Sequence, residues 1–97
     1  MTMMRAKLQV GFVQEQFGRE WTKPGEPQAP AKKTMEVLTM HAVAKNSAYP
    51  DDGTDEDNTF ARWSPGANLN INIANPDLFG KFSVGDKFYV DFTKVTE

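Results

Sequence analysis

The sequence contains no cysteine in its 97 residues, which excludes disulfide frameworks, zinc ribbons, iron–sulfur clusters and thiol catalysis. It has a single histidine, His41, and no serine lies in a Gly-x-Ser-x-Gly nucleophile elbow. A lone histidine in a strand-like segment is more typical of a packing residue than of a catalytic base. The glycines are scattered among turns instead of forming a phosphate-binding loop. The sequence therefore predicts no enzyme activity and no cofactor.

Long apolar runs and excess positive charge are also missing. No run approaches the roughly 20 apolar residues of a transmembrane helix, and the first eight residues lack the apolar stretch of a signal peptide. We therefore expect no membrane association. The formal net charge is −2, the wrong sign for a domain that binds phosphates by counterion release. With 39% hydrophobic and 25% charged residues, the composition fits one small globular domain over residues 1–97.

Apolar and polar residues alternate in residues 5–12, 68–75 and 87–93, which predicts half-buried strands. Residues 34–44 are also strand-like but have apolar side chains on both faces, so that strand is either buried on both sides or presents its second face to a partner. Residues 59–63 could add a short strand. The side chains predicted to face inward from the three alternating segments are Ala6, Leu8, Val10, Phe12, Leu69, Ile71, Ile73, Phe88, Val90 and Phe92.

Helix signals are confined to residues 75–80. Asn75 is a favourable N-cap, Pro76 suits a first helical position, and Gly80 can end the turn. We predict a single helical turn there. The fold class is accordingly all-β, a small antiparallel β-barrel or sandwich of five or six strands with one short helical turn.

Two segments do not fit this sheet. Residues 18–33 contain Pro24, Pro27 and Pro30 together with Trp21, so they predict an arm or loop instead of a central strand. We expect this segment to become ordered against a neighbouring subunit, unless Trp21 folds back onto its own domain. Residues 49–58 form a turn-rich acidic loop.

The acidic loop could in principle hold calcium, because it contains several hard oxygen donors. The spacing departs from the EF-hand pattern, since the glycine is third in the loop and the closing glutamate is missing. A solvated loop that aids solubility is the simpler interpretation, and we predict no metal site. The oxygen donors in question belong to Asp51, Asp52, Asp55, Asp57 and Asn58.

Binding to another protein is the better supported activity. Asn68, Asn70 and Asn72 form a polar, uncharged row that can hydrogen-bond across an interface with little desolvation cost, although simple exposure explains the row equally well. The segment with Trp21, Pro24 and Pro27 is already stiff, so ordering it on a neighbour loses less entropy than ordering a flexible linker. These six residues are the candidate partner-binding residues.

Nucleic-acid binding is the alternative. Phe60, Trp63 and Tyr89 could stack on bases, and Arg62 lies between two of those aromatics in sequence. The acidic loop that precedes them would repel a phosphate backbone, so core or interface packing is the favoured interpretation of these aromatics.

Four stretches resemble a family of short, mostly uncharacterised proteins of tailed bacteriophages: residues 4–7 (MRAK), 57–65 (DNTFARWSP), 73–76 (IANP) and 80–92 (GKFSVGDKFYVDF). The likeness covers residues 57–93 firmly and residues 4–17 loosely, and it does not include the proline-rich segment. It carries no catalytic signature and implies phage origin more strongly than any activity.

By analogy with other small β-rich phage proteins, the resemblance implies a non-enzymatic virion protein that decorates or cements the capsid. The expected partners are the major capsid protein and neighbouring copies of the chain itself. The expected location is the capsid surface of the virion, after synthesis in the host cytoplasm. Two alternatives remain open: an OB-like phage protein that binds single-stranded nucleic acid, and a small inhibitor of a host enzyme whose acidic loop mimics phosphate charge.

Overall fold

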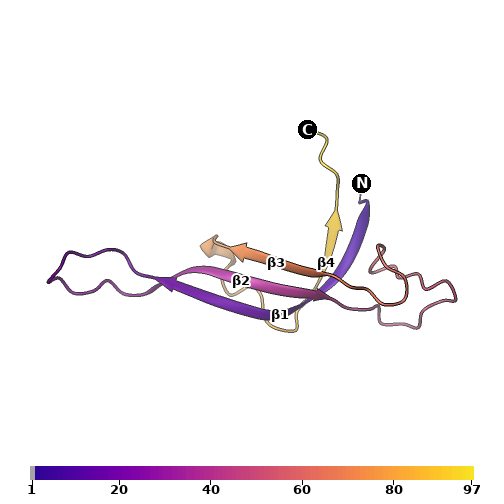
Figure 1. Cartoon of the computed structure of the whole chain (residues 1–97), viewed down its shortest axis with the longest axis horizontal. Helices are drawn as coiled ribbons and strands as arrows, with labels where there is room; N and C mark the ends of the chain where they lie inside the picture. The colour runs from indigo at the N-terminus through magenta and orange to yellow at the C-terminus, as the bar shows by residue number, and fades with distance from the viewer. Residues whose placement is uncertain (1) are drawn as a thin grey trace.

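The fold is built around one long β-hairpin. In the computed structural model, which describes residues 2–97, the hairpin consists of β1 (Met4–Gly18) and β2 (Lys32–Ala42). β3 (Asn68–Ile73) pairs with the outer side of β2, and β4 (Lys87–Phe92) pairs with the first part of β1. All pairs are antiparallel and the strand order is β3-β2-β1-β4 (Figure 1).

The all-β prediction is confirmed, but the predicted closed barrel or sandwich of five or six strands is wrong. The sheet has four strands and stays open. Residues 59–63, predicted as an extra strand, contribute only an isolated bridge between Arg62 and Thr54. Without a second sheet the molecule is long and thin, with extents of 70 × 34 × 18 Å.

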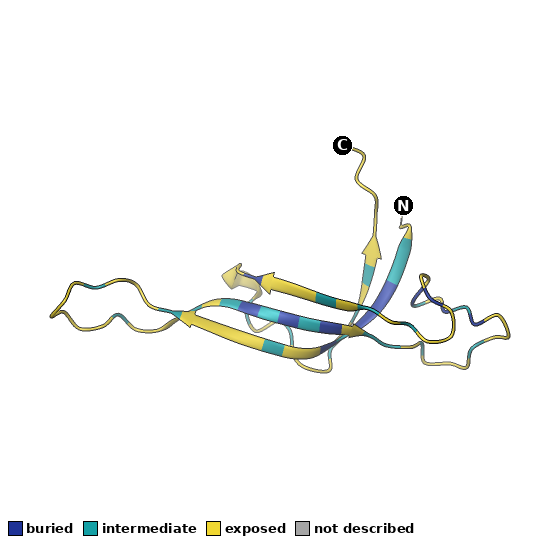
Figure 2. Ribbon diagram, in the orientation of Figure 1, coloured by how far each residue is buried: buried dark blue, intermediate teal, exposed yellow. Residues whose placement is uncertain are grey.

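The core lies on one face of the sheet, where the register places Val10 beside Met40 and Met40 beside Leu69. Facing residues in an antiparallel pair share a side of the sheet, so this row is one apolar stripe. The fully or nearly fully buried apolar residues of the sheet are Ala6, Leu8, Val10, Leu38, Met40 and Ile73. Figure 2 shows the resulting alternation along β2.

The chain between β3 and β4 is tied to the edge of this core. It contains the 3₁₀ helix η1 (Pro76–Leu78), whose first turn is capped by the Asn75 side chain accepting from the Asp77 N–H, so the predicted helical turn is confirmed. The ring of Phe82 lies 5.5 Å from that of Phe88, which packs on the core. Between η1 and Phe82, the Gly80 N–H donates to the buried carboxylate of Glu36.

A β-bulge at Gly11 changes which residues of β1 face the core. The register passes from Val10 opposite Met40 to Phe12 opposite Thr39, so β1 has one extra residue at this point. Phe12 therefore lies on the opposite face from Val10 and is 56% exposed, and its predicted inward position is wrong. The His41 ring occupies the space over Gly11, where an added Cβ would lie 3.1 Å from His41 Nδ1.

Two further residues predicted to be inward are substantially exposed. Ile71 is 39% exposed and Phe92 is 46% exposed. Both lie on the outermost strands, β3 and β4, and no second sheet covers them. The predicted alternation of apolar and polar residues in β3 and β4 is correct, but such alternation does not show whether other residues cover the apolar face of the sheet.

Residues 43–67 replace a strand beside the start of β1. β2 ends at Ala42, which lies opposite Leu8, so the earlier residues of β1 need other partners on that side. The Thr59 N–H donates to the Arg5 carbonyl (3.0 Å), and the Lys7 N–H donates to Asn58 Oδ1 (2.8 Å). A loop thereby supplies the hydrogen bonds that a strand would otherwise make.

Candidate interaction surfaces

The face opposite the core carries no charged side chain where β1, β2 and β3 lie side by side. The register forms three rows across the strands, and one of them joins Phe12, Thr39 and Asn70. Thr39 Oγ1 donates to Asn70 Oδ1 (3.0 Å), which shows that these side chains share a side. We call this surface the amide face; it consists of Gln9, Phe12, Gln14, Val37, Thr39, His41, Asn68, Asn70 and Asn72.

The amide face is open to solvent, and all three asparagines that the sequence singled out lie on it. Amide and hydroxyl groups lose less hydration free energy on burial than carboxylates or ammonium groups do. Phe12 adds an exposed aromatic ring in the middle row. A flat, neutral surface with one aromatic group is chemically suited to covering by another protein.

The second surface is the hairpin arm, residues 15–35, which extends the β1–β2 hairpin beyond the rest of the sheet (Figure 1). At its tip the Glu26 N–H donates to the Lys23 carbonyl, with Pro24 and Gly25 between them. Gly25 has φ of +90°, so the proline and the glycine occupy the positions that a type II turn requires. Across the loop, Arg19 Nη1 donates to the Ala29 carbonyl (2.7 Å).

Trp21, Pro24 and Pro27 are all exposed on this arm. Trp21 is 79% exposed, so it does not fold back onto its own sheet. Phe17, at the end of β1, is 58% exposed. Large apolar groups held in water on a thin ribbon are the usual sign of an interaction site. Ordering of the arm against a neighbouring subunit stays a prediction.

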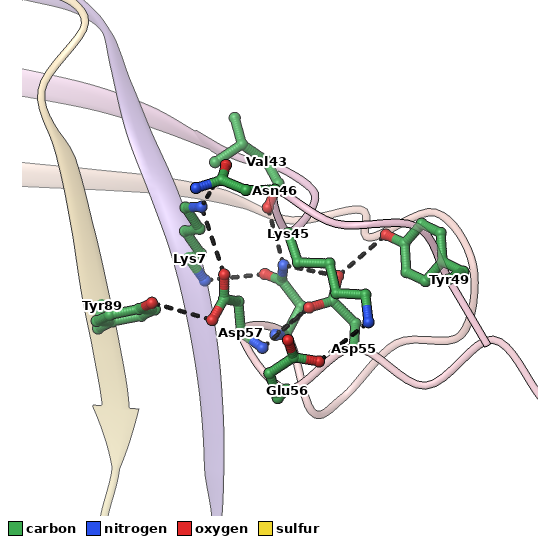
Figure 3. Close-up of polar contacts among 10 residues, drawn as sticks. Lys7, Val43, Lys45, Asn46, Tyr49, Asp55, Glu56, Asp57 and Tyr89 are labelled. Atoms are coloured by element: carbon green, nitrogen blue, oxygen red, sulfur yellow. Dashed lines mark hydrogen bonds and ion pairs between the residues drawn. The ribbon is translucent and has the colours of Figure 1, made fainter.

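The structure does not gather the four candidate nucleic-acid residues into one platform. Tyr89 lies in β4, with the Arg5 guanidinium 4.4 Å from its ring centre and its hydroxyl donating to Asp57 (Figure 3). The hydrogen bond with Asp57 is the main reason that the pKa of Tyr89 is raised.

The other three residues belong to the loop. The Trp63 ring lies against Gly53, where an added Cβ would be 2.6 Å from the indole, and its centre is 6.1 Å from that of Tyr49. Phe60 is 37% exposed, and Arg62 Nη1 donates to the adjacent Ala61 carbonyl. Trp63 and Tyr89 are therefore held by separate sets of contacts, each within the protein.

The acidic loop is organised around its own buried carboxylate, Asp55, instead of around open oxygen ligands. Asp55 accepts from the Tyr49 hydroxyl (3.0 Å), from the Asp57 N–H (2.9 Å) and from the backbone and side chain of Asn58 (Figure 3). Burial raises the pKa of Asp55, but these hydrogen bonds outweigh burial and leave it below its ordinary value. Residues 2–97 contain no cluster of three or more His, Cys, Asp or Glu side chains that could hold a metal ion.

Asn58 is the structural residue that sequence reasoning missed. It is completely buried, and its Nδ2 donates to the Val43 carbonyl (2.8 Å) while its Oδ1 accepts from Lys7. The Asn58 side-chain oxygen, one of the oxygen donors considered for calcium, is thus taken up by a hydrogen bond from the Lys7 N–H. The available signal was the short run from Asp55 to Asn58, which is typical of a turn closed by an Asp side chain.

Lys7 was predicted to lie on the wet face of its strand, yet it is only 7% exposed. Its Nζ lies 3.3 Å from Asn46 Oδ1 and 3.4 Å from Asp57 Oδ2, both in the loop that covers it. The aliphatic part of the side chain is covered while the ammonium group is paired. The predicted alternation of apolar and polar residues in β1 is correct, but no sequence pattern indicates that the loop of residues 43–67 covers Lys7.

Comparison with protein-family models, curated proteins and solved structures found no match to this chain. In the part of the chain that the structure describes, no helix has the length and apolar character needed to cross a membrane. The amide face and the hairpin arm are therefore the features of this molecule that bear on its function.

Proposed function

We propose that this chain is a non-enzymatic structural protein of a tailed-bacteriophage virion, which binds the assembled capsid and reinforces it. The observation that supports this most directly is the pair of surfaces, the uncovered amide face and the hairpin arm, on one thin sheet. A molecule 70 Å long with an exposed Trp21 at one end is suited to spanning the junction between neighbouring subunits.

The proposed mechanism is many modest contacts acting together. The amide face would lie on the major capsid protein, and the arm would reach a neighbouring subunit or a neighbouring copy of the chain. Because each copy is held at more than one place, weak individual contacts give strong overall attachment. The uncharged amide face limits the desolvation cost of each contact.

Mass spectrometry of purified virions tests the location. The proposal expects this chain at a fixed ratio to the major capsid protein; its absence from virions, despite abundant synthesis in infected cells, would overturn the proposal.

A binding assay tests the surface. Purified chain should co-sediment with capsids that lack it, and Asn70→Lys should weaken this attachment because it introduces a charge into the amide face. Thr96→Lys, which adds the same single positive charge to the exposed chain after β4, is the matched control and should attach normally. Equal attachment of Asn70→Lys and wild type would remove the amide face from the mechanism.

The same material tests the alternatives. Tight, salt-sensitive binding of a labelled single-stranded oligonucleotide would favour a nucleic-acid role for Phe60, Arg62, Trp63 and Tyr89.

The inhibitor alternative requires exposed loop carboxylates that imitate phosphate. Asp55 is buried, and Asp57 pairs with Lys7 and Tyr89, which leaves fewer loop carboxylates available for this role.

A further inference from the structure

The hairpin arm has two unpaired strand edges. β4 pairs with β1 only as far as Gln9, and the Val10 backbone adds hydrogen bonds to Gly85 and Asp86. On the other side, β3 pairs with β2 only as far as Glu36. Among the described residues, β1 from Val13 to Gly18 therefore pairs only with β2, and β2 from Lys32 to Met35 pairs only with β1. A ribbon of two strands is marginally stable by itself.

The two edges differ in how they are protected. The β2 edge carries Lys32 and Lys33, and the register skips Thr34 there, so the strand is irregular at that point. Lysines and irregularities of this kind prevent an edge from pairing with other chains. The β1 edge from Val13 to Gly18 has no lysine, no proline and no extra residue. The β1 edge is therefore the one able to accept another strand.

We propose that this β1 edge pairs antiparallel with the β1 edge of a second copy, about a two-fold axis at Phe17. In this register Phe17 faces its own copy and Gln16 faces Gly18. Glu15 faces Arg19 of the second copy, the residue that directly follows β1. Two-fold symmetry makes that oppositely charged pair twice. Residues directly opposite across an antiparallel pair lie on one side of the sheet and interact most strongly.

The charges select this register over its neighbours. An axis at Glu15 would place two carboxylates opposite each other, which is destabilising. An axis at Gln16 would leave Glu15 opposite Phe17 and Arg19 opposite Val13, with no ion pair. Both charged groups are accessible to a second copy. The Glu15 side chain is 54% exposed, with Lys33 Nζ of its own chain at 3.6 Å, and Arg19 uses one of its N–H groups on Ala29.

The inference rests on the proposed function in taking a neighbouring copy of the chain as the partner, and it defines how the copies meet. Because opposite residues share a side, pairing through β1 would place both amide faces on the same side of one continuous sheet. Each pair of copies would then present two amide faces to the capsid, which is the arrangement that multivalent attachment needs.

Charge-reversal variants of the full chain test the pairing by sedimentation equilibrium. Arg19→Glu and Glu15→Arg should each weaken self-association about tenfold or more, because each places like charges opposite across the axis. An equimolar mixture of the two variants should associate as wild type does, since every facing pair is again of opposite charge. Lys94→Glu, the same charge change in the exposed chain after β4, is the control and should associate normally.

A wild-type chain that stays monomeric at the highest soluble concentration would overturn the pairing, as would a mixture that fails to recover association. Circular dichroism of each variant verifies that the sheet is intact. Phe17→Lys gives a second test: it should weaken self-association, because it places two ammonium groups at the axis. A wild-type chain that attaches to capsids but never self-associates would overturn the pairing alone. Self-association without any presence in virions would overturn the proposed function alone.

Discussion

The same two strands, β1 and β2, run through two regions that differ in almost every physical respect. Within the sheet they have neighbours on both sides, and Val10 and Leu38 are each 1% exposed. In the hairpin arm they have only each other, and Phe17 and Trp21 lie in water. The difference shows that strand neighbours and covering loops, more than strand propensity, decide where this chain buries apolar surface.

The largest expected contrast is between core and arm side chains. Leu38→Ala should lower the free energy of unfolding by about 2–5 kcal/mol, because it removes buried methyl groups and leaves a cavity. Phe17→Ala should change it by no more than about 0.5 kcal/mol, because the ring is already solvated. Urea unfolding measures both, and equal losses would show that the arm is packed within the monomer.

A comparison of two asparagines isolates the loop that replaces a strand. Asn58→Ala should cost about 2–4 kcal/mol, because the Lys7 N–H and the Val43 carbonyl would both lose a buried partner. Asn72→Ala, at an exposed position on the amide face, is the matched control and should be nearly neutral. If both substitutions are neutral, the loop does not stabilise the start of β1.

Acid should lower the free energy of unfolding through protonation of Glu36, which lies where the hairpin arm joins the rest of the sheet. The hydrogen bond from Lys33 lowers the pKa of Glu36; burial opposes this effect, and the Gly80 N–H supports it. A lowered pKa means that the unfolded chain binds the proton first, so stability is present above the unfolded pKa of about 4.3 and is lost as pH falls through the folded value.

Urea midpoints between pH 7 and pH 3 check this. They should fall for wild type below about pH 4.5 and fall less steeply for Glu36→Gln, which has no proton to gain. Glu26→Gln, at the exposed tip of the arm, is the control and should keep the wild-type slope. Identical slopes for all three proteins would mean that Glu36 contributes nothing to the acid response.

Removing the tip itself is expected to change stability only slightly. Deletion of residues 23–31 takes away exposed residues of a surface loop, so the melting temperature should shift by no more than about 4 °C. The shortened chain should nevertheless lose attachment to capsids. Calorimetry and co-sedimentation measure the two properties, and a deletion that attaches normally would remove the tip from the mechanism.

The parts of the fold that sequence predicted correctly are those governed by local rules. Alternation located β3 and β4, and the capping residue Asn75 located η1. The prolines correctly indicated a break in the sheet, although the predicted loop of residues 18–33 is shorter, since Gly18 lies in β1 and Lys32 and Lys33 lie in β2. For β2, the sequence predicted apolar side chains on both faces, and the register places Leu38 and Met40 on the core face and Val37 on the opposite one.

The parts that could not be predicted depend on contacts between distant residues. The bulge at Gly11 moves Phe12 to the other face, and a glycine between apolar residues does not by itself announce an extra residue. Lys7 and Asn58 are buried because the loop of residues 43–67 crosses β1. The two residues are joined by a hydrogen bond although they are 51 positions apart in the sequence. Likewise, the three asparagines of β3 belong to a wider uncharged surface only because β2 and β1 lie beside them in the sheet.

The pairing of β1 with β4 has a consequence for the order of folding. Met4 lies opposite Phe92, and Arg5 makes two hydrogen bonds to Asp91, at 2.7 and 3.1 Å, across 86 residues of chain. β1 therefore cannot complete its pairing until β4, 86 residues later, has been synthesised, and contacts at this separation form slowly. The hairpin between β1 and β2 can form on the ribosome, but β4 can join it only after β4 itself has emerged.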